Sequence, residues 1–348
     1  MNKFIAGMIA VFGAAAFAIF CIIVFEAPPI DTVQRGFRGL GMVENTNPRL
    51  ERIKVGANQL PEPTPPSDKA GHTAASVYKN VPILGSMDEA DFLRLMSDIT
   101  AWVAPQQGCV YCHDENDYAA ERPYTKIVSR RMLEMVRYIN GSWKTHVADT
   151  GVSCFACHRG QPVPANAWFL PKRSQPFNIV GNRPAQNLAT GSENVAFMAV
   201  QNQPFAPFLQ KTDEIRVVPT RVLHGKNVPS MQATEATYGL MGHISQALGV
   251  NCTYCHNSRS FMSWDQSTPQ RSTAWYAIRM VRALNNDYLE PLKPVFPANR
   301  LGPQGDVAKV NCTTCHAGVA KPLYGAAMIK DYPILVGPAP ARTASAAK

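Results

Sequence analysis

The chain has 348 residues, of which 46% are hydrophobic and 28 are prolines, and its formal charge is +9. This length suggests one or two folded domains, and the prolines predict long irregular connections. The sequence has no run of lysines and arginines that would form a nucleic-acid-binding patch, so we expect no nucleic acid among the partners.

Residues 1–26 are predicted to anchor the chain in a membrane. The stretch from Phe4 to Phe25 carries no charge, and at about 1.5 Å of rise per residue a helix of this length crosses a hydrocarbon core of about 30 Å. Lys3 on its N-terminal side favours a cytoplasmic N-terminus. A cleaved signal peptide is the alternative. Cys21 follows Ala18-Ile19-Phe20 rather than the small residues that lipoprotein processing needs, so it is most simply a buried apolar residue.

Residues 27–76 are rich in proline, glycine and asparagine and show little periodicity, which predicts an irregular segment. It is either a solvated linker or, next to the membrane, a segment that lies along partner subunits. Residues 77–164 form the first predicted compact unit. A helix is expected from Ser86 to Ala101, with Ser86 as its N-cap and Met96 on its apolar face. A second amphipathic helix is expected from Thr125 to Asn140. Gly141 is predicted to stop it.

The second half of the chain repeats this plan. Residues 165–220 are predicted to be a linker, 221–325 a second compact unit and 326–348 a flexible tail. Leu240-Met241-Gly242-His243-Ile244 matches Leu95-Met96-Ser97-Asp98-Ile99 of the first unit, and Arg279-Met280-Val281-Arg282 matches Glu134-Met135-Val136-Arg137. We therefore predict an internal duplication.

Each unit contains two copies of one pentapeptide pattern, Cys-x-x-Cys-His. The copies are Cys109-Val110-Tyr111-Cys112-His113, Cys154-Phe155-Ala156-Cys157-His158, Cys252-Thr253-Tyr254-Cys255-His256 and Cys312-Thr313-Thr314-Cys315-His316. This pattern is the attachment signature of c-type haem, in which the two thiols bind the porphyrin and the histidine binds the iron. A zinc or disulfide framework is the alternative, and it would not place a histidine uniformly after each cysteine pair. The sequence predicts four covalently bound haem c groups.

Haem attachment also accounts for the charge and the compartment. Four haems carry about eight propionate charges, which lysines and arginines can pair, so the positive balance is largely internal compensation. Thioether attachment occurs outside the cytoplasmic membrane, and a cysteine-rich chain is typical of that compartment. We therefore expect the haem-binding part on the periplasmic side of the inner membrane.

Each motif histidine is predicted to be one axial iron ligand, which leaves four further ligands to assign. Methionine and histidine are the usual candidates. Met96 and Met241 occupy equivalent places in the two halves, and we predict that they serve the first and third haems. Met132 and Met135 are both candidates for the second haem.

The fourth haem has no obvious methionine. Ala277 stands at the position that corresponds to Met132, so the ligand must come from elsewhere. His146 has no counterpart in the second half and could cross to it. His224 and His243 are the alternatives.

The sequence resembles the tetrahaem cytochrome subunit of the photosynthetic reaction centre of purple bacteria. The similarity runs through 34–42, Tyr78-Lys79-Asn80-Val81 and Leu95-Met96, and through both duplicated units. In that family three haems have Met/His ligation and one has two histidines. The resemblance implies Met132 over Met135 and His146 over His224. One departure is the N-terminus, where some members carry lipid on a cysteine and this sequence is predicted to keep a helix.

The resemblance implies a fold and a function. The expected fold is mainly α with long irregular loops, a multihaem c-type cytochrome built from two pseudo-twofold-related dihaem modules, plus an N-terminal transmembrane helix. The chain would be an electron carrier and not an enzyme. It would accept electrons from a soluble c-type cytochrome or a high-potential iron–sulfur protein and re-reduce the bacteriochlorophyll special pair held by membrane subunits.

Two other functions are compatible with the motifs alone. A multihaem reductase would need a five-coordinate iron, and a respiratory carrier would feed a terminal oxidase. A separate hypothesis concerns Arg271, which matches Lys126 in the duplication. We expect Arg271 either to pair with a propionate or raise a haem potential, or to be an ordinary surface cation at a helix start.

Overall fold

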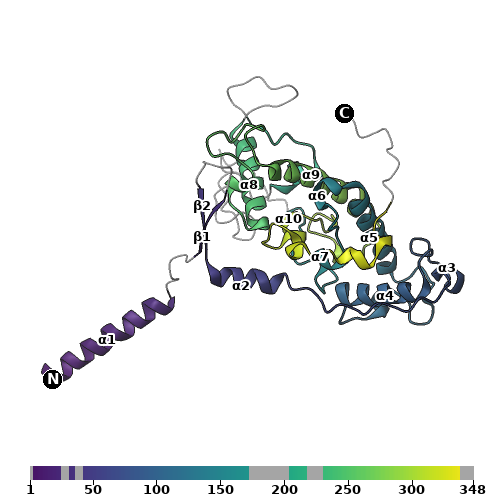
Figure 1. Ribbon diagram of the computed structural model, residues 1–348, viewed down its shortest axis with the longest axis horizontal. Helices are drawn as coiled ribbons and strands as arrows, with labels where there is room; N and C mark the ends of the chain where they lie inside the picture. The colour runs from purple at the N-terminus through teal and green to yellow at the C-terminus, as the bar shows by residue number, and fades with distance from the viewer. Residues whose placement is uncertain (1–2, 25–30, 36–41, 172–203, 218–229, 338–348) are drawn as a thin grey trace.

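The computed structural model describes residues 3–24, 31–35, 42–171, 204–217 and 230–337. This part of the chain is mainly helical, as predicted, and its two strands form one short antiparallel pair, β1 (Asp31–Arg35) and β2 (Met42–Thr46). The α-helices are α1 Lys3–Val24, α2 Pro48–Ala57, α3 Ala74–Val77, α4 Glu89–Val103, α5 Tyr124–Ser142, α6 Lys144–Val147, α7 Cys154–His158, α8 Met231–Leu248, α9 Pro269–Ala283 and α10 Cys312–His316 (Figure 1).

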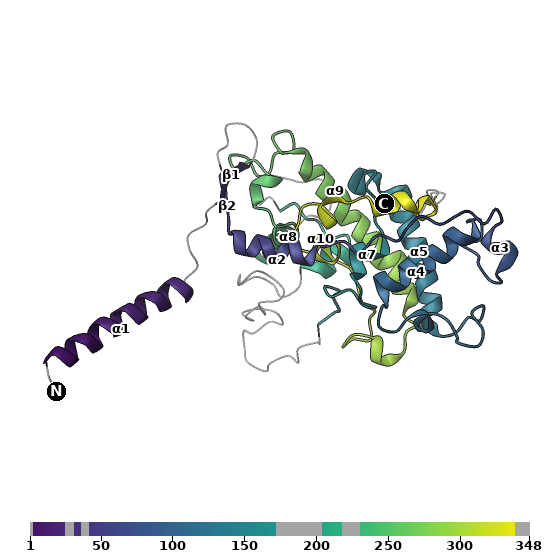
Figure 2. The ribbon, with the colours of Figure 1, turned by 60° about the horizontal axis from the view of Figure 1, so that its bottom comes forward.

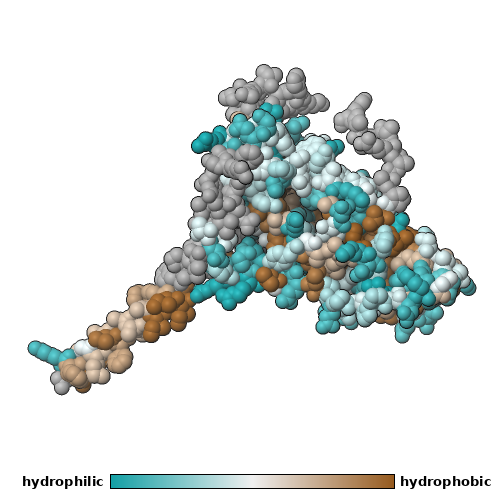
Figure 3. Space-filling view, in the orientation of Figure 1, coloured by the Kyte–Doolittle hydropathy of each residue, from teal (hydrophilic) through white to brown (hydrophobic). Residues whose placement is uncertain are grey.

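Helix α1 lies within the predicted anchor 1–26 and matches its uncharged stretch, Phe4 to Phe25, within one residue at each end. It has 22 residues and no described part of the chain buries any of them. Its surface is hydrophobic along most of its length (Figure 3). By length and composition α1 can cross a membrane.

Helix α4 begins three residues later than predicted. Its N-cap is Asp88 and not Ser86, because the Asp88 carboxylate accepts a hydrogen bond from the backbone N–H of Ala90 at 3.1 Å. The same carboxylate also accepts from the N–H groups of Ala70 and Gly71 at 3.0 and 2.9 Å. A charged cap that serves two segments outcompetes the serine.

Helix α5 continues through Gly141 to Ser142, whereas the sequence predicted that the glycine would stop it. Asn140 explains the extension. It is buried, and its side-chain amide donates to the carbonyl oxygens of Val152 and Leu335 at 3.0 and 2.9 Å. Tertiary contacts therefore hold the last turn in place and override the low helix propensity of glycine.

The predicted linker contributes to the core in its described parts. Phe208 and Leu209 lie in a short π-helix, η2 (Ala206–Gln210), and are 2% and 0% exposed. Together with Trp168 and Phe205 they pack in the cluster that α8 and α9 build. Residues 165–171 and 204–217 therefore do more than connect the two units; residues 172–203 lie outside the described chain.

The predicted flexible tail is also ordered up to residue 337. Ile329, Tyr332 and Leu335 are all buried, with Leu335 fully inaccessible. Tyr332 and Leu335 pack against α4 and α5 in a second core cluster. The prediction of a flexible tail was wrong for 326–337 because this segment folds into short 3₁₀ turns. Their apolar residues do not show the periodicity that identifies a helix in a sequence. Residues 338–348 lie outside the described chain.

The N-terminal segment contacts the body of the molecule after α2. Asn58 caps α2 and donates its side-chain amide to the carbonyl oxygen of Ala317 at 3.2 Å. Further along, Thr64 donates its hydroxyl to Asp98 of α4. The segment 27–76, which was expected to be irregular, contains β1, β2 and α2; residues 36–41 lie outside the described chain.

The motif helices lie at the centre of the body. Helix α10 packs against α8 and α7, and α7 packs against α4. Figures 1 and 2 both show α7, α10 and α8 side by side. The two halves of the chain therefore meet through their attachment motifs.

Candidate haem-binding sites

The first and third motifs have the same local structure. Each cysteine pair forms a single 3₁₀ turn, η1 (Cys109–Tyr111) and η3 (Cys252–Tyr254). In each half a threonine of the next helix start donates its hydroxyl to a carbonyl oxygen of that turn: Thr125 to Tyr111, and Thr268 to Tyr254 at 2.6 Å. The same hydrogen bond thus fixes the motif to the following helix in both halves.

The second and fourth motifs share a different structure. Both form five-residue α-helices, α7 and α10. Each helix ends in a left-handed residue, Arg159 with φ 51° and Ala317 with φ 47°. The two kinds of motif alternate along the chain, as a duplication of a two-motif unit predicts.

All four motif histidines are held by the same hydrogen bond. The Nδ1–H group donates to a backbone carbonyl oxygen three or five residues later, at 2.9 to 3.0 Å. The acceptors are Tyr118 for His113, Gln161 for His158, Phe261 for His256 and Val319 for His316. Because a carbonyl oxygen only accepts, Nε2 keeps its lone pair, which is the arrangement of a metal-ligating imidazole.

Burial acts on three of these four imidazoles and favours their neutral form. It lowers the pKa of His158 and His256, and it lowers the pKa of His316 to about 4. A neutral imidazole has a free lone pair at ordinary pH, so these groups are ready to bind a metal.

The first two motifs face one cavity of about 1380 Å³. Its lining includes the cysteine pair and histidine of the first motif, and Cys154, Cys157 and His158 of the second. This volume exceeds the 300 to 1,000 Å³ that is typical of a pocket for one small molecule. The space is large enough for more than one bulky group.

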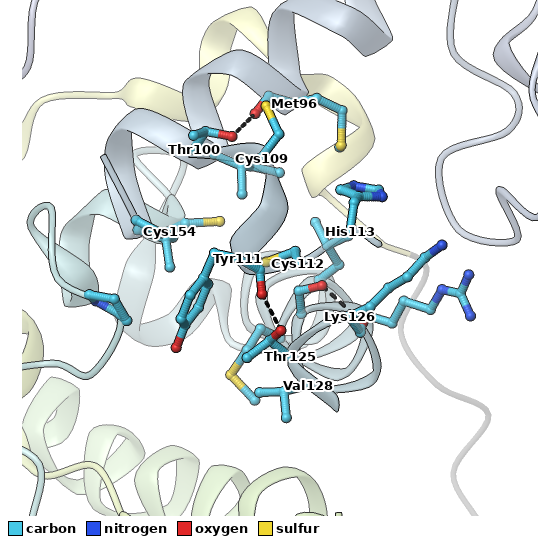
Figure 4. A pocket seen from close by; sticks show the side chains of 18 of the residues that line it. Met96, Thr100, Cys109, Tyr111, Cys112, His113, Thr125, Lys126, Val128 and Cys154 are labelled. Carbon is cyan, nitrogen blue, oxygen red and sulfur yellow. Dashed lines mark hydrogen bonds between the residues drawn. The ribbon is translucent and has the colours of Figure 1, made fainter. Parts of the chain in front are cut away.

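Methionines reach the same cavity. Met96 of α4 and His113 point their side chains toward the same space in Figure 4. Met132 and Met135 of α5 line the cavity as well. Met135 is buried in the core, whereas Met132 is only partly buried. Both remain within the lining, so the choice of Met132 stays a prediction.

The cavity suits an anionic, largely apolar cofactor. Five basic residues line it against one acid, Asp117; they are Lys79, Lys126, Arg130, Arg300 and Lys309. Arg300 and Lys309 belong to the second half of the chain, although the motifs belong to the first. Paired cysteines, histidines, methionines and basic side chains together fit haem c, whose propionates need cations.

His146 and His316 face each other across the two halves. Their ring centroids are 6.0 Å apart with the planes tilted by 57°. The His146 Nδ1–H group donates to the carbonyl oxygen of Thr273 on α9 at 3.2 Å, so its Nε2 is also free. Burial lowers its pKa. Thus His146 has the hydrogen-bonding arrangement of the motif histidines.

The remaining candidates are placed differently. Met241 is partly buried on α8, against the core cluster of the second half. His243 is 6% exposed and its ring meets the Phe205 ring edge-on at 4.6 Å. No described residue partners its Nε2 atom, and burial lowers the pKa of His243 to about 4. His224 lies outside the described residues.

The cysteines are free thiols. None of the nine forms a disulfide. Burial raises the pKa of Cys154 and Cys255 to about 11 and that of Cys312 to about 12. Among the described residues no group of three or more His, Cys, Asp and Glu side chains could hold a metal ion.

The second and fourth motifs touch through their cysteines. The sulfur atoms of Cys157 and Cys315 are 2.8 Å apart. Arg159 donates to the carbonyl oxygen of Cys315 at 2.9 Å and to the Asn58 side chain at 3.1 Å. One cation therefore joins the second motif, the fourth motif and the end of α2.

Arg271 and Lys126 do share a role. Lys126 is 6% exposed and donates its amine to the carbonyl oxygens of Tyr118 and Ala120, in the loop after the first motif. Arg271 donates to the Ser263 carbonyl at 2.7 Å in the loop after the third motif, and it lies 4.1 Å over the Trp264 ring. Each cation secures the loop that accepts the motif histidine's hydrogen bond.

Sequence patterns did not reveal the residues that come from distant segments. Arg300 and Lys309 line the first cavity, and Asp98 of α4 accepts hydrogen bonds from Tyr332, 234 residues later, and from Thr64, 34 residues earlier. No motif marks these positions. Contacts between separate segments of the chain leave no local signal in one sequence.

Fold and motifs together define a mainly helical c-type cytochrome with several attachment motifs. Comparison with known proteins identifies the family of cytochromes to which the chain belongs. The family model for the photosynthetic reaction centre cytochrome c subunit matches residues 26–336. The chain belongs to this family, whose members are electron-carrier components of photosynthesis and not enzymes.

Three relatives carry the same name. The photosynthetic reaction center cytochrome c subunit of Rubrivivax gelatinosus is 50% identical over 92% of this chain and 87% of its own length. Those of Thermochromatium tepidum and Roseobacter denitrificans are 47% and 38% identical, over 92% and 94% of this chain and 81% and 90% of their own lengths. The chain therefore binds haem c and associates with a reaction centre.

Proposed function

We propose that this chain binds four haem c groups and re-reduces the photo-oxidised special pair of a reaction centre. The observation that carries the proposal is the cavity that two complete attachment motifs share. Each bound haem would supply one-electron iron chemistry. An iron with protein ligands on both sides has no open position for a substrate, which favours electron transfer over catalysis.

We assign the thioether bonds to the eight motif cysteines and the iron ligands to four pairs of side chains. The pairs are Met96 with His113, Met132 with His158, Met241 with His256, and His146 with His316. The facing rings of His146 and His316 support the fourth pair, and the shared cavity supports the first two.

The four attachment sites would lie in the order first, second, fourth, third. The first and second share a cavity, and Cys157 touches Cys315 between the second and fourth. Helices α8 and α10 pack together, and α8 leads directly into the third motif. Gly249 at the end of α8 approaches Gly318 beside the fourth motif closely. A row in this order keeps each site next to its neighbours.

The repeated local structures support two dihaem modules related by a pseudo-twofold. Motifs one and three share the threonine hydrogen bond. Motifs two and four share a short α-helix whose C-cap residue has a positive φ. The proposed modules are 77–164 and 221–325, with the membrane anchor at 1–26 and the segment 27–76 along the membrane subunits.

The partners would be the bacteriochlorophyll-carrying membrane subunits and a soluble donor, either a c-type cytochrome or a high-potential iron–sulfur protein. Glu115 and Asp117 are exposed beside the first motif, and complementary charge would speed the encounter with a donor that has a positive docking face. Helix α1 would cross the inner photosynthetic membrane once, with the haem-binding part on the periplasmic side.

Intact mass of the purified chain tests the cofactor count and the anchor together. We expect the mass of the full polypeptide plus four haems. Fewer haems, or loss of the first residues, would each contradict one part of the proposal. A high-spin ferric spectrum with carbon monoxide binding at neutral pH would favour a reductase. Absence of bacteriochlorophyll-containing subunits from the purified complex would favour a respiratory carrier.

A further inference from the structure

Helix α4 presents two different faces. One face lines the first cavity with Met96, Thr100 and Val103. The opposite face is buried, with Leu95 and Asp98 0% and 6% exposed. An α-helix turns by about 100° per residue, so Asp98 points roughly 200° away from Met96. The buried face thus carries a carboxylate behind the proposed iron ligand.

Both oxygens of Asp98 are hydrogen-bonded to residues outside α4, one earlier and one later in the chain. Tyr332 donates its hydroxyl to Oδ2, and Thr64 donates its hydroxyl to Oδ1. Tyr332 is 2% exposed. Burial and the hydrogen bond to Asp98 raise the pKa of Tyr332, so the phenol keeps its proton and remains a donor. The two donors hold the carboxylate from two sides.

A second layer holds the donors themselves. Arg94, one turn earlier on α4, lies 4.9 Å over the Tyr332 ring and donates to the Thr64 carbonyl oxygen at 3.1 Å. Trp102, one turn later, meets the Tyr332 ring edge-on at 6.0 Å. Tyr332 therefore sits between two side chains of the helix whose carboxylate it binds.

These hydrogen bonds restrict the rotation of α4 in a way that apolar contacts do not. Leu95 and Trp102 can slide against an apolar neighbour, because the hydrophobic effect has no preferred direction. Hydrogen bonds weaken steeply when their angles change. A rotation of α4 that moved Met96 away from His113 would break the bonds of Asp98 and leave a buried charge unpaired.

We propose that Tyr332 and Thr64 are positioning residues for Met96: by holding the Asp98 carboxylate, they fix the rotation of α4 and keep the Met96 thioether directed toward His113. The inference rests on the proposed pairing of Met96 with His113.

The second half of the chain offers an internal reference. His243 occupies the place of Asp98 in the duplication, two residues after Met241. It is buried against Phe205, and no described residue bonds its Nε2 atom. Within the described residues, the third site therefore has no counterpart of the Tyr332 hydroxyl, and removing that hydroxyl should leave the third site unchanged.

The test uses the full haem-loaded chain with Tyr332→Phe, which keeps the ring and its contacts with Arg94 and Trp102. Two quantities are measured: the near-infrared charge-transfer band of methionine-bound ferric haem, and carbon monoxide binding to the reduced protein. We expect one site to lose part of its band and to bind carbon monoxide about tenfold more tightly, since a hydrogen bond to a charged group is lost. Tyr324→Phe is the matched control, because Tyr324 is 54% exposed.

Two further variants make the result decisive. Thr64→Val removes the other donor and should have the same effect at the same site, even if Tyr332→Phe does not fold. Met96→Leu tests the ligand pair itself. If Met96→Leu alters the band and carbon monoxide binding while Tyr332→Phe and Thr64→Val do not, the positioning role is wrong. If Met96→Leu alters neither, the proposed ligand is wrong.

Discussion

The imidazole rings of His146 and His316 lie 6.0 Å apart although they come from different halves of the chain. Each ring donates its Nδ1–H to a backbone carbonyl oxygen, at 3.2 and 3.0 Å. Both Nε2 atoms are therefore left as acceptors. This is the hydrogen-bonding arrangement that the proposed pairing of His146 with His316 as iron ligands requires.

His146→Leu should disturb the fourth site and spare the second, although His146 is nearer in sequence to the second motif. Loss of one imidazole would leave a five-coordinate iron, so reduced protein should bind carbon monoxide at one site. Redox titration should show that site's midpoint potential shifted by at least about 59 mV, the one-electron equivalent of a tenfold change in relative ligand affinity. His72→Leu, at an exposed histidine, is the control. A change at the second site would show that the crossover is wrong.

Met96→Leu and Met241→Leu should each lower the potential of one site, because a thioether ligand raises the haem potential. Titration of each variant should show one component moving down by at least about 59 mV, and a different component in each. Met262→Leu is the control, since Met262 is 58% exposed and off the proposed ligand set. Unchanged titrations would remove the corresponding ligand assignment.

Gly249→Ala should destabilise the contact between the third and fourth motifs. Gly249 has φ +63°, and an added Cβ would lie 2.1 Å from the carbonyl oxygen of Gly318. Left-handed strain and overpacking cost at least about 1 kcal/mol in free energy of unfolding. Denaturant unfolding followed by haem absorbance measures it. Gly56→Ala, where the added Cβ meets nothing within 4 Å, should be neutral or stabilising. An equal loss of unfolding free energy in both variants would show that the contact with Gly318 is not the cause.

Acid should release the segment that precedes α3 from the start of α4. The Lys69 amine and the Ser67 hydroxyl lower the pKa of Asp91, and backbone N–H groups of Ala70 and Gly71 help to lower that of Asp88. A lowered carboxylate pKa contributes stability above the unfolded value of about 3.9, and this stability is lost as pH falls through the folded pKa.

Pulsed hydrogen exchange on the peptide 67–72 measures that release. We expect protection of its amides to fall below about pH 3.9. Asp91→Asn should reduce protection already at neutral pH and weaken its dependence on acid. Protection that is independent of pH in the unmodified chain would contradict the proposal that the Asp88 and Asp91 carboxylates hold this segment.

Arg271→Gln should lower the potential of the third site. Arg271 holds the Ser263 carbonyl, and the same loop carries the Phe261 carbonyl that accepts from His256. Without the guanidinium the loop loses a charge-assisted bond, and the positive charge near the iron is gone. Arg271→Lys should restore part of the potential. Potentials that stay within experimental scatter in Arg271→Gln would leave Arg271 as a surface cation.

The sequence predicted those features whose signal is local. The motif spacing identified the cysteines and histidines, and the hydrophobic periodicity and composition identified α1, α4 and α5. Features that depend on distant contacts were missed. Asp88 displaced Ser86 as a cap because Ala70 and Gly71 also bind it, and Leu335 ordered the tail because α5 offered Asn140 as a donor. Lys309 lines the first cavity because the fold brings the second half of the chain against the first, and no local pattern marks it.

Flash-induced absorbance on the purified complex tests the central claim most directly. After a single flash, we predict that the special pair recovers with the same time course as the loss of one reduced haem band from this chain. Complexes prepared without the chain should recover more slowly. Recovery that is equally fast without the chain, or that leaves the haem bands unchanged, would contradict the account.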